Sequence, residues 1–148
     1  MNTSPKRLKR IINLYPPYLG AGIRVDYISE DWKEIRVSMR IRMYNRNIVG
    51  THFGGSLYAL IDPHVMLMLM NLLGKEYTVW DKAASIEFIK ASKKPVSAMI
   101  QIPDEVIEEI KQKTENGEKY LPTFSVDIRD EDGELVARAE KVIYVRRK

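Results

Sequence analysis

Residues 56–73 form the longest apolar segment of the chain, SLYALIDPHVMLMLMNLL, and they constrain its fold more than any other stretch. Apolar residues fill almost every position rather than one stripe, which is typical of a helix buried on nearly all sides. Two adjacent glycines, Gly54 and Gly55, precede the segment, and one acid, Asp62, lies within it. Because burial penalises the charged form of a carboxyl group, Asp62 needs a structural or functional reason to be there.

The segments around this helix show the two-residue period of strands that bury one face. From Glu34 to Met43 the alternation is unbroken, and its apolar members are Ile35, Val37, Met39, Ile41 and Met43. Asp132 and Gly133 supply a hairpin turn between the last two strands. The pattern predicts strands at about 22–30, 34–43, 77–90, 96–102, 124–129 and 134–144.

Two shorter helices complete the predicted elements. Ser4 can cap a helix that begins at Pro5 and ends before Pro16, and residues 104–113 are expected to form an exposed helix or lid. The order of two strands, a long helix and four strands differs from a βαβ repeat. We therefore predict an α+β fold in which one long central helix is wrapped by an antiparallel sheet of about six strands.

Composition limits the number of domains and the available chemistry. A chain of 148 residues, 45% of them hydrophobic, can build one substantial core, so we expect a single domain over residues 1–148. With no cysteine and only two histidines, His52 and His64, disulfides are excluded and a metal site is not expected. The N-terminus has no apolar run of signal-peptide length, and polar residues interrupt the apolar helix, so we expect a cytoplasmic protein with no membrane partner.

The formal net charge of +4 comes from basic residues that cluster at both ends of the chain and along residues 36–46. Such a surface suits phosphate groups. No aromatic-interleaved strand motif or recognition-helix pattern accompanies the basic residues, so we expect no nucleic-acid partner. A solvated strand face is the structural alternative for these arginines.

A functional interpretation depends on the paired glycines and on Asp62. With no side chains at Gly54 and Gly55, a ligand oxygen can approach the free N–H groups of the helix N-terminus, where negative charge is favoured. Asp62 is followed by Pro63, which breaks the helical hydrogen-bond ladder. A structural role for Asp62 at a kink is therefore the alternative to a catalytic one.

These features resemble the hotdog-fold acyl-CoA thioesterases, and the resemblance covers most of the chain. In the phenylacetate-pathway branch the motif is Gly-x-x-His-Gly-Gly with Asp on the following helix. Gly50, Gly54, Gly55 and Asp62 occupy the matching positions, whereas Phe53 stands where that branch has histidine. A closer resemblance is to the branch described as tetrameric acyl-CoA thioesterase-like, in the segments GTHFGGSLYALIDP, VWDKAASIEF and YVRR.

The resemblance implies hydrolysis of an acyl-CoA or related thioester, without a cofactor, in a site formed between protomers of a homodimer or homotetramer. The N–H of Gly55, with that of Gly54 or Ser56, would form the oxyanion hole. Asp62 would activate water as general base or attack the thioester carbonyl as nucleophile. The motif loop would contribute substrate contacts from Asn47 and Phe53.

Several basic residues are further candidates for substrate binding. His52 precedes the glycine turn, where it would orient the substrate or bond to the loop backbone. Unless a bulge intervenes, Lys82 shares one side of its strand with apolar residues and requires a carboxylate partner, Asp81 or the facing protomer's Asp62. The family places the phosphates of coenzyme A near the loop after this strand, which carries Lys90, Lys93 and Lys94.

Each of these basic residues also has a structural interpretation: a histidine bonded within its loop, a structural ion pair, and a solvated lysine turn. Two other functions stay open. A catalytically silent hotdog domain that binds acyl-CoA or another lipid-like acid would fit the missing motif histidine. A hydroxyacyl-thioester dehydratase would place Asp62 within reach of a histidine across the pocket, either His52 or His64.

Overall fold

The computed structural model describes residues 3–148 and has the predicted α+β class. Its helices are α1 (Pro5–Asn13), α2 (Pro16–Ala21), α3 (Gly54–Ile61), α4 (His64–Leu73) and α5 (Asp104–Lys113). Its strands are β1 (Ile23–Ile28), β2 (Glu34–Met39), β3 (Tyr77–Phe88), β4 (Val96–Gln101), β5 (Lys119–Tyr120), β6 (Thr123–Asp130) and β7 (Leu135–Arg147).

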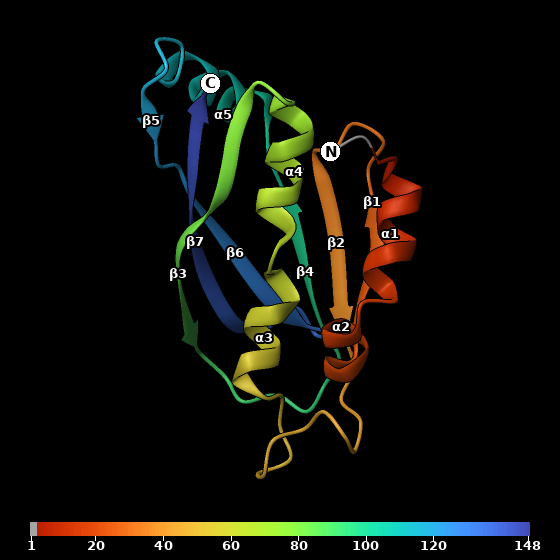
Figure 1. Ribbon diagram of the computed structural model, residues 1–148. Helices are drawn as coiled ribbons and strands as arrows, with labels where there is room; N and C mark the ends of the chain where they lie inside the picture. Colours follow the sequence, from red (N-terminus) through yellow and green to blue (C-terminus); the bar gives the residue numbers. More distant parts are fainter. Residues whose placement is uncertain (1–2) are drawn as a thin grey trace.

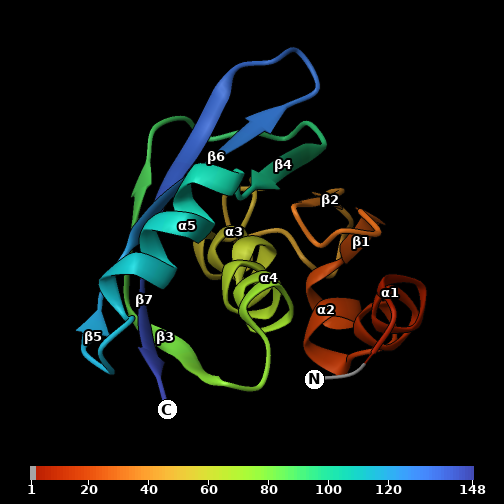
Figure 2. The same ribbon diagram turned by 90° about the horizontal axis from the view of Figure 1, so that it is seen from above.

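The seven strands of the described residues form one antiparallel sheet with the order β1-β2-β4-β6-β7-β3, and the short β5 pairs with β7. The sheet curves around α3 and α4, which follow one another along its inner face (Figure 1, Figure 2). This confirms a central helical layer wrapped by an antiparallel sheet, with one short strand more than predicted. β3 is the last strand at one edge of the sheet.

The core lies between the inner face of the sheet and the central helices. Inward residues of β2 and β4 alternate as predicted, and the helices contribute fully buried side chains to the same cluster, namely Leu60, Ile61, Val65, Met68 and Leu69. Burial of each such side chain contributes about 1.5–3 kcal/mol. The helices are therefore firmly held against the sheet, which fixes the positions of α3's first residues and of the junction between α3 and α4.

The predicted long central helix is present but divided at Asp62, next to the proline that was expected to break its hydrogen-bond ladder. α3 ends at Ile61, Asp62 has an extended backbone (φ −88°, ψ 132°), and α4 begins at His64. Pro63 offers no N–H to the ladder and disfavours helical geometry in the residue before it. By length and composition Gly54–Leu73 would suffice to cross a membrane, but core helices of soluble proteins meet the same criterion.

β2 ends at Met39, four residues before the end that the alternation predicted. The chain turns there because the buried Asn45 side chain bonds to three backbone groups: it accepts from the N–H of Arg42 (2.6 Å) and donates to two carbonyls, those of Ala21 (2.9 Å) and Arg40 (2.8 Å). Met43 is consequently 84% exposed instead of facing the core.

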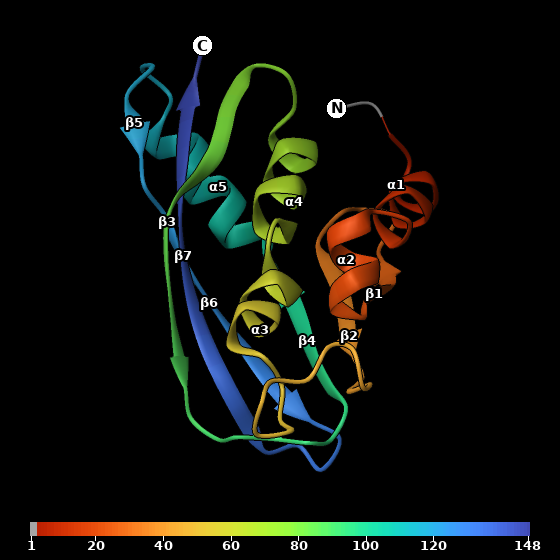
Figure 3. The same ribbon diagram turned by 60° about the horizontal axis from the view of Figure 1, so that its bottom comes forward.

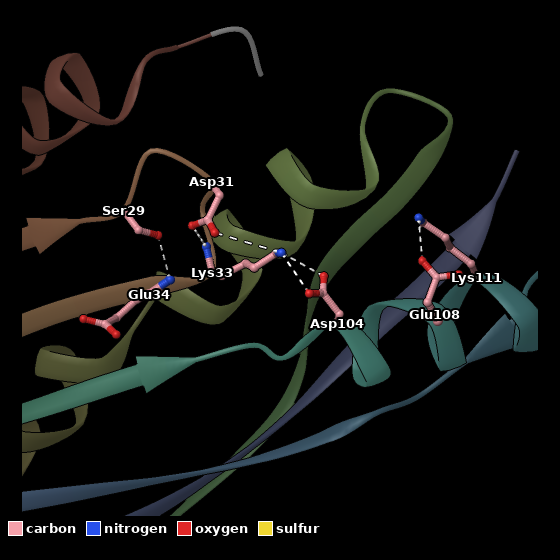
Figure 4. Close-up of polar contacts among 7 residues, drawn as sticks. All are labelled: Ser29, Asp31, Lys33, Glu34, Asp104, Glu108 and Lys111. Carbon is pink, nitrogen blue, oxygen red and sulfur yellow. Dashed lines mark hydrogen bonds and ion pairs between the residues drawn. The ribbon is translucent and has the colours of Figure 1, made fainter.

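The other three helices pack outside the central layer. α1 and α2 pack beside β1, and α2, which the sequence did not predict, starts at Pro16 (Figure 2). α5 has the predicted bounds. Its first residue, Asp104, accepts a hydrogen bond from Lys33 (3.0 Å), which also pairs with Asp31 in the turn between β1 and β2 (Figure 4). These exposed contacts contribute at most about 1 kcal/mol each, so they orient α5 more than they stabilise it.

Substitution of Asn45 by alanine is expected to destabilise the protein by about 2 to 3 kcal/mol, because the change removes three partly buried hydrogen bonds and leaves their backbone groups without that partner. Urea denaturation followed by circular dichroism measures the free energy of unfolding. The exposed Asn116→Ala variant serves as the matched control. Equal stability of the two variants would contradict the role assigned to Asn45.

Candidate active site

The carboxylate of Asp62 lies between the central helices and the sheet, where it pairs with a lysine from the last long strand. Its Oδ1 accepts a hydrogen bond from Nζ of Lys141 on β7 at 2.6 Å. The Asp62 side chain is 39% exposed, whereas that of Lys141 is fully buried. The helix break thus directs a partly accessible carboxylate onto a buried cation.

Lys141 has a second carboxylate beside it. Asp81 Oδ1 on β3 lies 2.8 Å from Nζ of Lys141, which makes an ion pair, although its angles do not meet those of a hydrogen bond. The hydroxyl of Tyr58, on α3, lies 3.3 Å from the same Nζ. Burial alone would lower the pKa of Lys141, but the two carboxylates outweigh burial and raise the pKa to about 12. The lysine is therefore an ammonium at any ordinary pH.

A hydrogen-bonded pair holds the backbone of Asp62. The Tyr18 hydroxyl, on α2, donates to the carbonyl oxygen of Asp62, and Nε2 of His64 lies 2.9 Å from the same hydroxyl. In the neutral ring that fits this arrangement, Nε2 carries the proton and donates to Tyr18. Burial lowers the pKa of His64 to about 4 and, helped by Asp62, raises the pKa of Tyr18 well above its usual value. His64 thus acts as a structural, uncharged histidine.

A β-bulge explains why the sequence placed the wrong residue beside the carboxylates. The pairing of β3 with β7 shifts register between Asp81 and Ala83, which leaves Lys82 as the extra residue. A bulge exchanges the two faces of a strand from that point onward. Asp81 therefore faces inward and Lys82 is exposed: the bulge under which the predicted inward placement of Lys82 would not hold is present. A substrate contact by Lys82 stays a prediction.

Lys141 itself has a sequence signal that the prediction missed. On β7 the inward residues alternate, and Lys141 is the one charged member of the buried series Ala137, Ala139, Lys141, Ile143 and Val145. A lysine within such a series requires a buried carboxylate. Asp62 and Asp81 are 79 and 60 positions away in the chain, so the sequence pattern alone does not identify the partners.

The first turn of α3 is open at its N-terminus, as the paired glycines predicted. Within residues 3–148, the N–H groups of Gly54 and Gly55 have no acceptor, whereas the N–H of Ser56 donates to the carbonyl of Phe53 (3.0 Å). Ser56 is therefore a poorer oxyanion donor than the glycines. A Cβ at Gly54 would approach the Phe88 ring to 2.9 Å, and one at Gly55 would approach the Phe53 ring to 2.7 Å.

A pocket of about 390 Å³ opens beside this turn. It lies between the loop that leads into α3 and the loop that follows β3, which run side by side at the lower end of the molecule (Figure 3). Its walls combine apolar and polar side chains and include Asn47, Val49, His52, Leu57, Phe88 and Lys90. The pocket brings together several residues that the sequence predicted to bind substrate.

Two of those residues make structural contacts in the loop. The Nδ2 group of Asn47 donates to the Thr51 hydroxyl (2.8 Å) and the His52 carbonyl (3.2 Å). The ring of His52 bonds through Nε2 to the carbonyl of Lys94 (2.7 Å), and burial lowers its pKa. Their contacts with a substrate stay predictions: Asn47 braces its own loop, and His52 joins that loop to the one after β3.

The lysine loop after β3 is partly neutralised. Lys90 pairs with Glu134 and Lys94 pairs with Asp132, both acids lying at the hairpin turn between β6 and β7. The pairing raises the pKa of Lys94. Lys93 is exposed in the same loop. A phosphate that binds here therefore competes with two carboxylates for Lys90 and Lys94.

Comparisons with known proteins identify the family and the fold of the chain. The protein family described as a domain of unknown function, DUF4442, matches residues 5–145. The chain belongs to this family. No curated protein matches this DUF4442 domain.

Solved structures show which fold the DUF4442 domain has. One is a Pseudomonas aeruginosa protein of unknown function described as a probable thioesterase, with a TM-score of 0.83, 17% identity, and coverage of 100% of this chain and 99% of that chain. A Haemophilus influenzae thioesterase has a TM-score of 0.70, 16% identity, and coverage of 99% and 93%. A second P. aeruginosa thioesterase, in a variant form, has a TM-score of 0.70, 12% identity, and coverage of 100% and 97%. The hotdog fold is confirmed, and the phenylacetate-pathway branch is not.

Because His64 is neutral in the folded protein, acid should destabilise it. An unfolded histidine binds a proton below its ordinary pKa of 6.5, while His64 resists protonation until about pH 4. The free energy of unfolding that neutral His64 contributes is therefore present above pH 6.5 and is lost as the pH falls toward 4. Between pH 7.5 and 5 the parent should lose about 2 kcal/mol more than His64→Gln. Urea denaturation at both pH values measures this, and equal losses would show that His64 titrates normally.

Proposed function

We propose that this protein is a thioesterase that hydrolyses acyl-CoA or a related thioester in a site completed by a second copy of the chain. One observation carries the proposal: a partly exposed carboxylate, Asp62, and two unpaired glycine N–H groups lie at opposite ends of one short helix, α3. Structures with the same fold include proteins named as thioesterases, which supports the reaction class.

The spacing along α3 favours a site shared between protomers. Asp62 is seven positions after Gly55, and at 1.5 Å per residue the helix places them about 10 Å apart. A reacting carbonyl must lie about 3 Å from its oxyanion donor, with the attacking water equally close to the base. Gly55 and Asp62 of one chain therefore do not serve the same carbonyl, and a second chain is needed.

The edge strand β3 offers a way to bring the two halves together. Asp62 is connected through Lys141 to Asp81, in the first half of β3, whereas Gly54 lies against Phe88, the last residue of that strand. Two-fold symmetric, antiparallel pairing of β3 with its copy sets the first half of each strand beside the second half of the other. Asp62 then approaches the partner's α3 N-terminus. A tetramer would stack two such dimers.

In this arrangement each group has a defined chemical role. The glycine N–H groups of one protomer hydrogen-bond to the thioester carbonyl oxygen and stabilise the negative charge that develops there. Asp62 of the other protomer removes a proton from water as the water oxygen bonds to the carbonyl carbon. Collapse of the tetrahedral intermediate breaks the carbon–sulfur bond, and the thiolate takes up a proton. The products are a carboxylic acid and a free thiol.

The pocket of about 390 Å³ beside the α3 N-terminus suits part of such a substrate. Its apolar walls would contact the acyl group or the pantetheine arm. The lysine loop at its rim would meet the phosphates of coenzyme A, with Lys93 as the residue best placed to do so because Lys90 and Lys94 already pair with acids.

A dehydratase is disfavoured by the positions of both histidines. His64 is buried and bonded to Tyr18, and His52 is buried and bonded to the carbonyl of Lys94. Neither ring is free to face a substrate from across a dimer. The chemistry is therefore expected to depend on the carboxylate rather than on a carboxylate–histidine pair.

The variant Asp62→Asn is expected to lose turnover by about 10² or more, because it removes the base while keeping nearly the same shape. Free thiol release from a panel of acyl-CoAs measures turnover, and the affinity for acyl-CoA should stay near that of the parent. If the parent hydrolyses nothing but binds acyl-CoA, the silent binding domain is the correct interpretation. Unchanged turnover in the variant would make Asp62 structural.

Mixing two inactive variants tests the shared site directly. Asp62→Asn lacks the base, and Gly55→Pro lacks the oxyanion donor. Position 55 lies in the first helical turn, where the missing N–H of proline is tolerated, and the exposed Phe53 ring, 2.7 Å from an added Cβ, has room to move aside. After subunit exchange, each heterodimer contains one intact site, so about one quarter of the parental activity should return. A site within one chain predicts no recovery. Light scattering checks that dimers form, and a stable monomer at micromolar concentration would exclude the shared site.

A further inference from the structure

The buried cluster of one ammonium between two carboxylates does more than fill space. Lys141 is 0% exposed, its Nζ lies 2.6 Å from Asp62 and 2.8 Å from Asp81, and its contacts connect β7, β3 and the α3–α4 junction. Ion pairs in which one partner is fully buried seldom improve stability over apolar residues of the same volume. Stability alone therefore gives no reason for the cluster.

We propose that Lys141 and Asp81 are positioning residues that set the charge and orientation of Asp62 from opposite directions. This role rests on the thioesterase function proposed above, in which Asp62 is the base. Lys141 places a positive charge 2.6 Å from Oδ1 of Asp62 and occupies that oxygen, which leaves Oδ2 to bind the attacking water. Asp81 pairs with the same ammonium and so weakens the electrostatic attraction between Lys141 and Asp62.

The need for both residues follows from the chemistry of a general base. A carboxylate beside a single ammonium stays ionised to low pH but is a weak base, because the ammonium stabilises its charged form. A carboxylate without a cation, in a partly buried place, is a better base but becomes protonated more readily. An ammonium shared between two carboxylates attracts each of them less strongly than it would attract one alone. Asp62 then lies between these two extremes.

The bulge in β3 supports a functional role for the inward position of Asp81. Counted back from Ala84 and Ile86, which pair with inward residues of β7, regular alternation would have turned Lys82 inward and Asp81 outward. The extra residue at position 82 instead delivers a carboxylate to the inner face. Bulges that re-aim a side chain in this way occur preferentially beside active sites.

The other titratable groups around Asp62 do not compete for this role. From α2, Tyr18 reaches its backbone carbonyl, and from α4, His64 is bonded to Tyr18 and uncharged at neutral pH. From α3, the Tyr58 hydroxyl contacts Lys141. Lys141 on β7 and Asp81 on β3 are thus the charged residues that determine the field at Asp62 from the elements packed against it.

The test compares two variants whose effects have opposite signs. Lys141→Met removes the cation while keeping the apolar length of the side chain, so the acid limb of kcat/KM should move to higher pH by about 1 to 3 units. Asp81→Asn leaves the whole ammonium to Asp62, so the acid limb should move to lower pH by up to about one unit. The titration of the ¹³C-labelled Asp62 carboxyl group, followed by NMR in the full-length protein, should show the same two shifts.

The controls separate failure of this inference from failure of the proposed function. Lys119→Met removes an exposed lysine of β5 outside the cluster and should shift neither measurement. If the parent has no hydrolase activity, the proposed function fails, and the NMR titrations alone decide the coupling. If Lys141→Met does not fold, Asp81→Asn decides it. Unmoved titrations, or shifts of both variants in the same direction, would overturn the inference.

Discussion

The buried ammonium of Lys141 is the interaction on which the arrangement of the site depends. Its side chain starts from β7, deep in the sheet, and is held at its tip by carboxylates from two other elements, Asp62 and Asp81. Removing either acid would leave a fully buried charge with half of its compensation, which is costly in a protein interior. The helix break at Asp62 and the bulge at Lys82 both serve to bring an acid to this one cation. Two irregularities that look unrelated in the chain therefore have the same structural result.

The regular part of the fold could be read from the sequence because it follows local rules. The inward series of β4 and the bounds of α5 depend on side-chain period and composition, which are visible without knowledge of the partners. The irregular parts were missed because they depend on contacts between distant residues. β2 stops at Met39 because Asn45 bonds to the backbone around it, and the faces of β3 exchange because of one extra residue. Periodicity assumes that neither event occurs.

The same distinction applies to the candidate site. The Gly54–Gly55 turn and Asp62 lie within one short segment with a recognisable pattern, so they could be proposed from sequence. The residues that hold Asp62 come from elsewhere: Tyr18 from α2 and Lys141 from β7. Sequence reasoning did infer that a lysine among apolar residues needs a carboxylate. The bulge leaves Lys82 exposed, and the lysine to which the rule applies is Lys141 on β7. The physical rule was right, and the residue to which it applied depended on register.

The absence of a free histidine from the pocket agrees with thioester hydrolysis in a specific way. A dehydratase or an amide hydrolase needs an acid that protonates a poor leaving group, and imidazole is the usual choice near neutral pH. A thiol has a pKa near 8.5, far below that of water, so a thiolate leaves without prior protonation. A carboxylate base and backbone N–H donors are then sufficient. In this chain both imidazoles are buried in structural contacts, while Asp62 stays partly exposed, which is the division of roles that such a reaction requires.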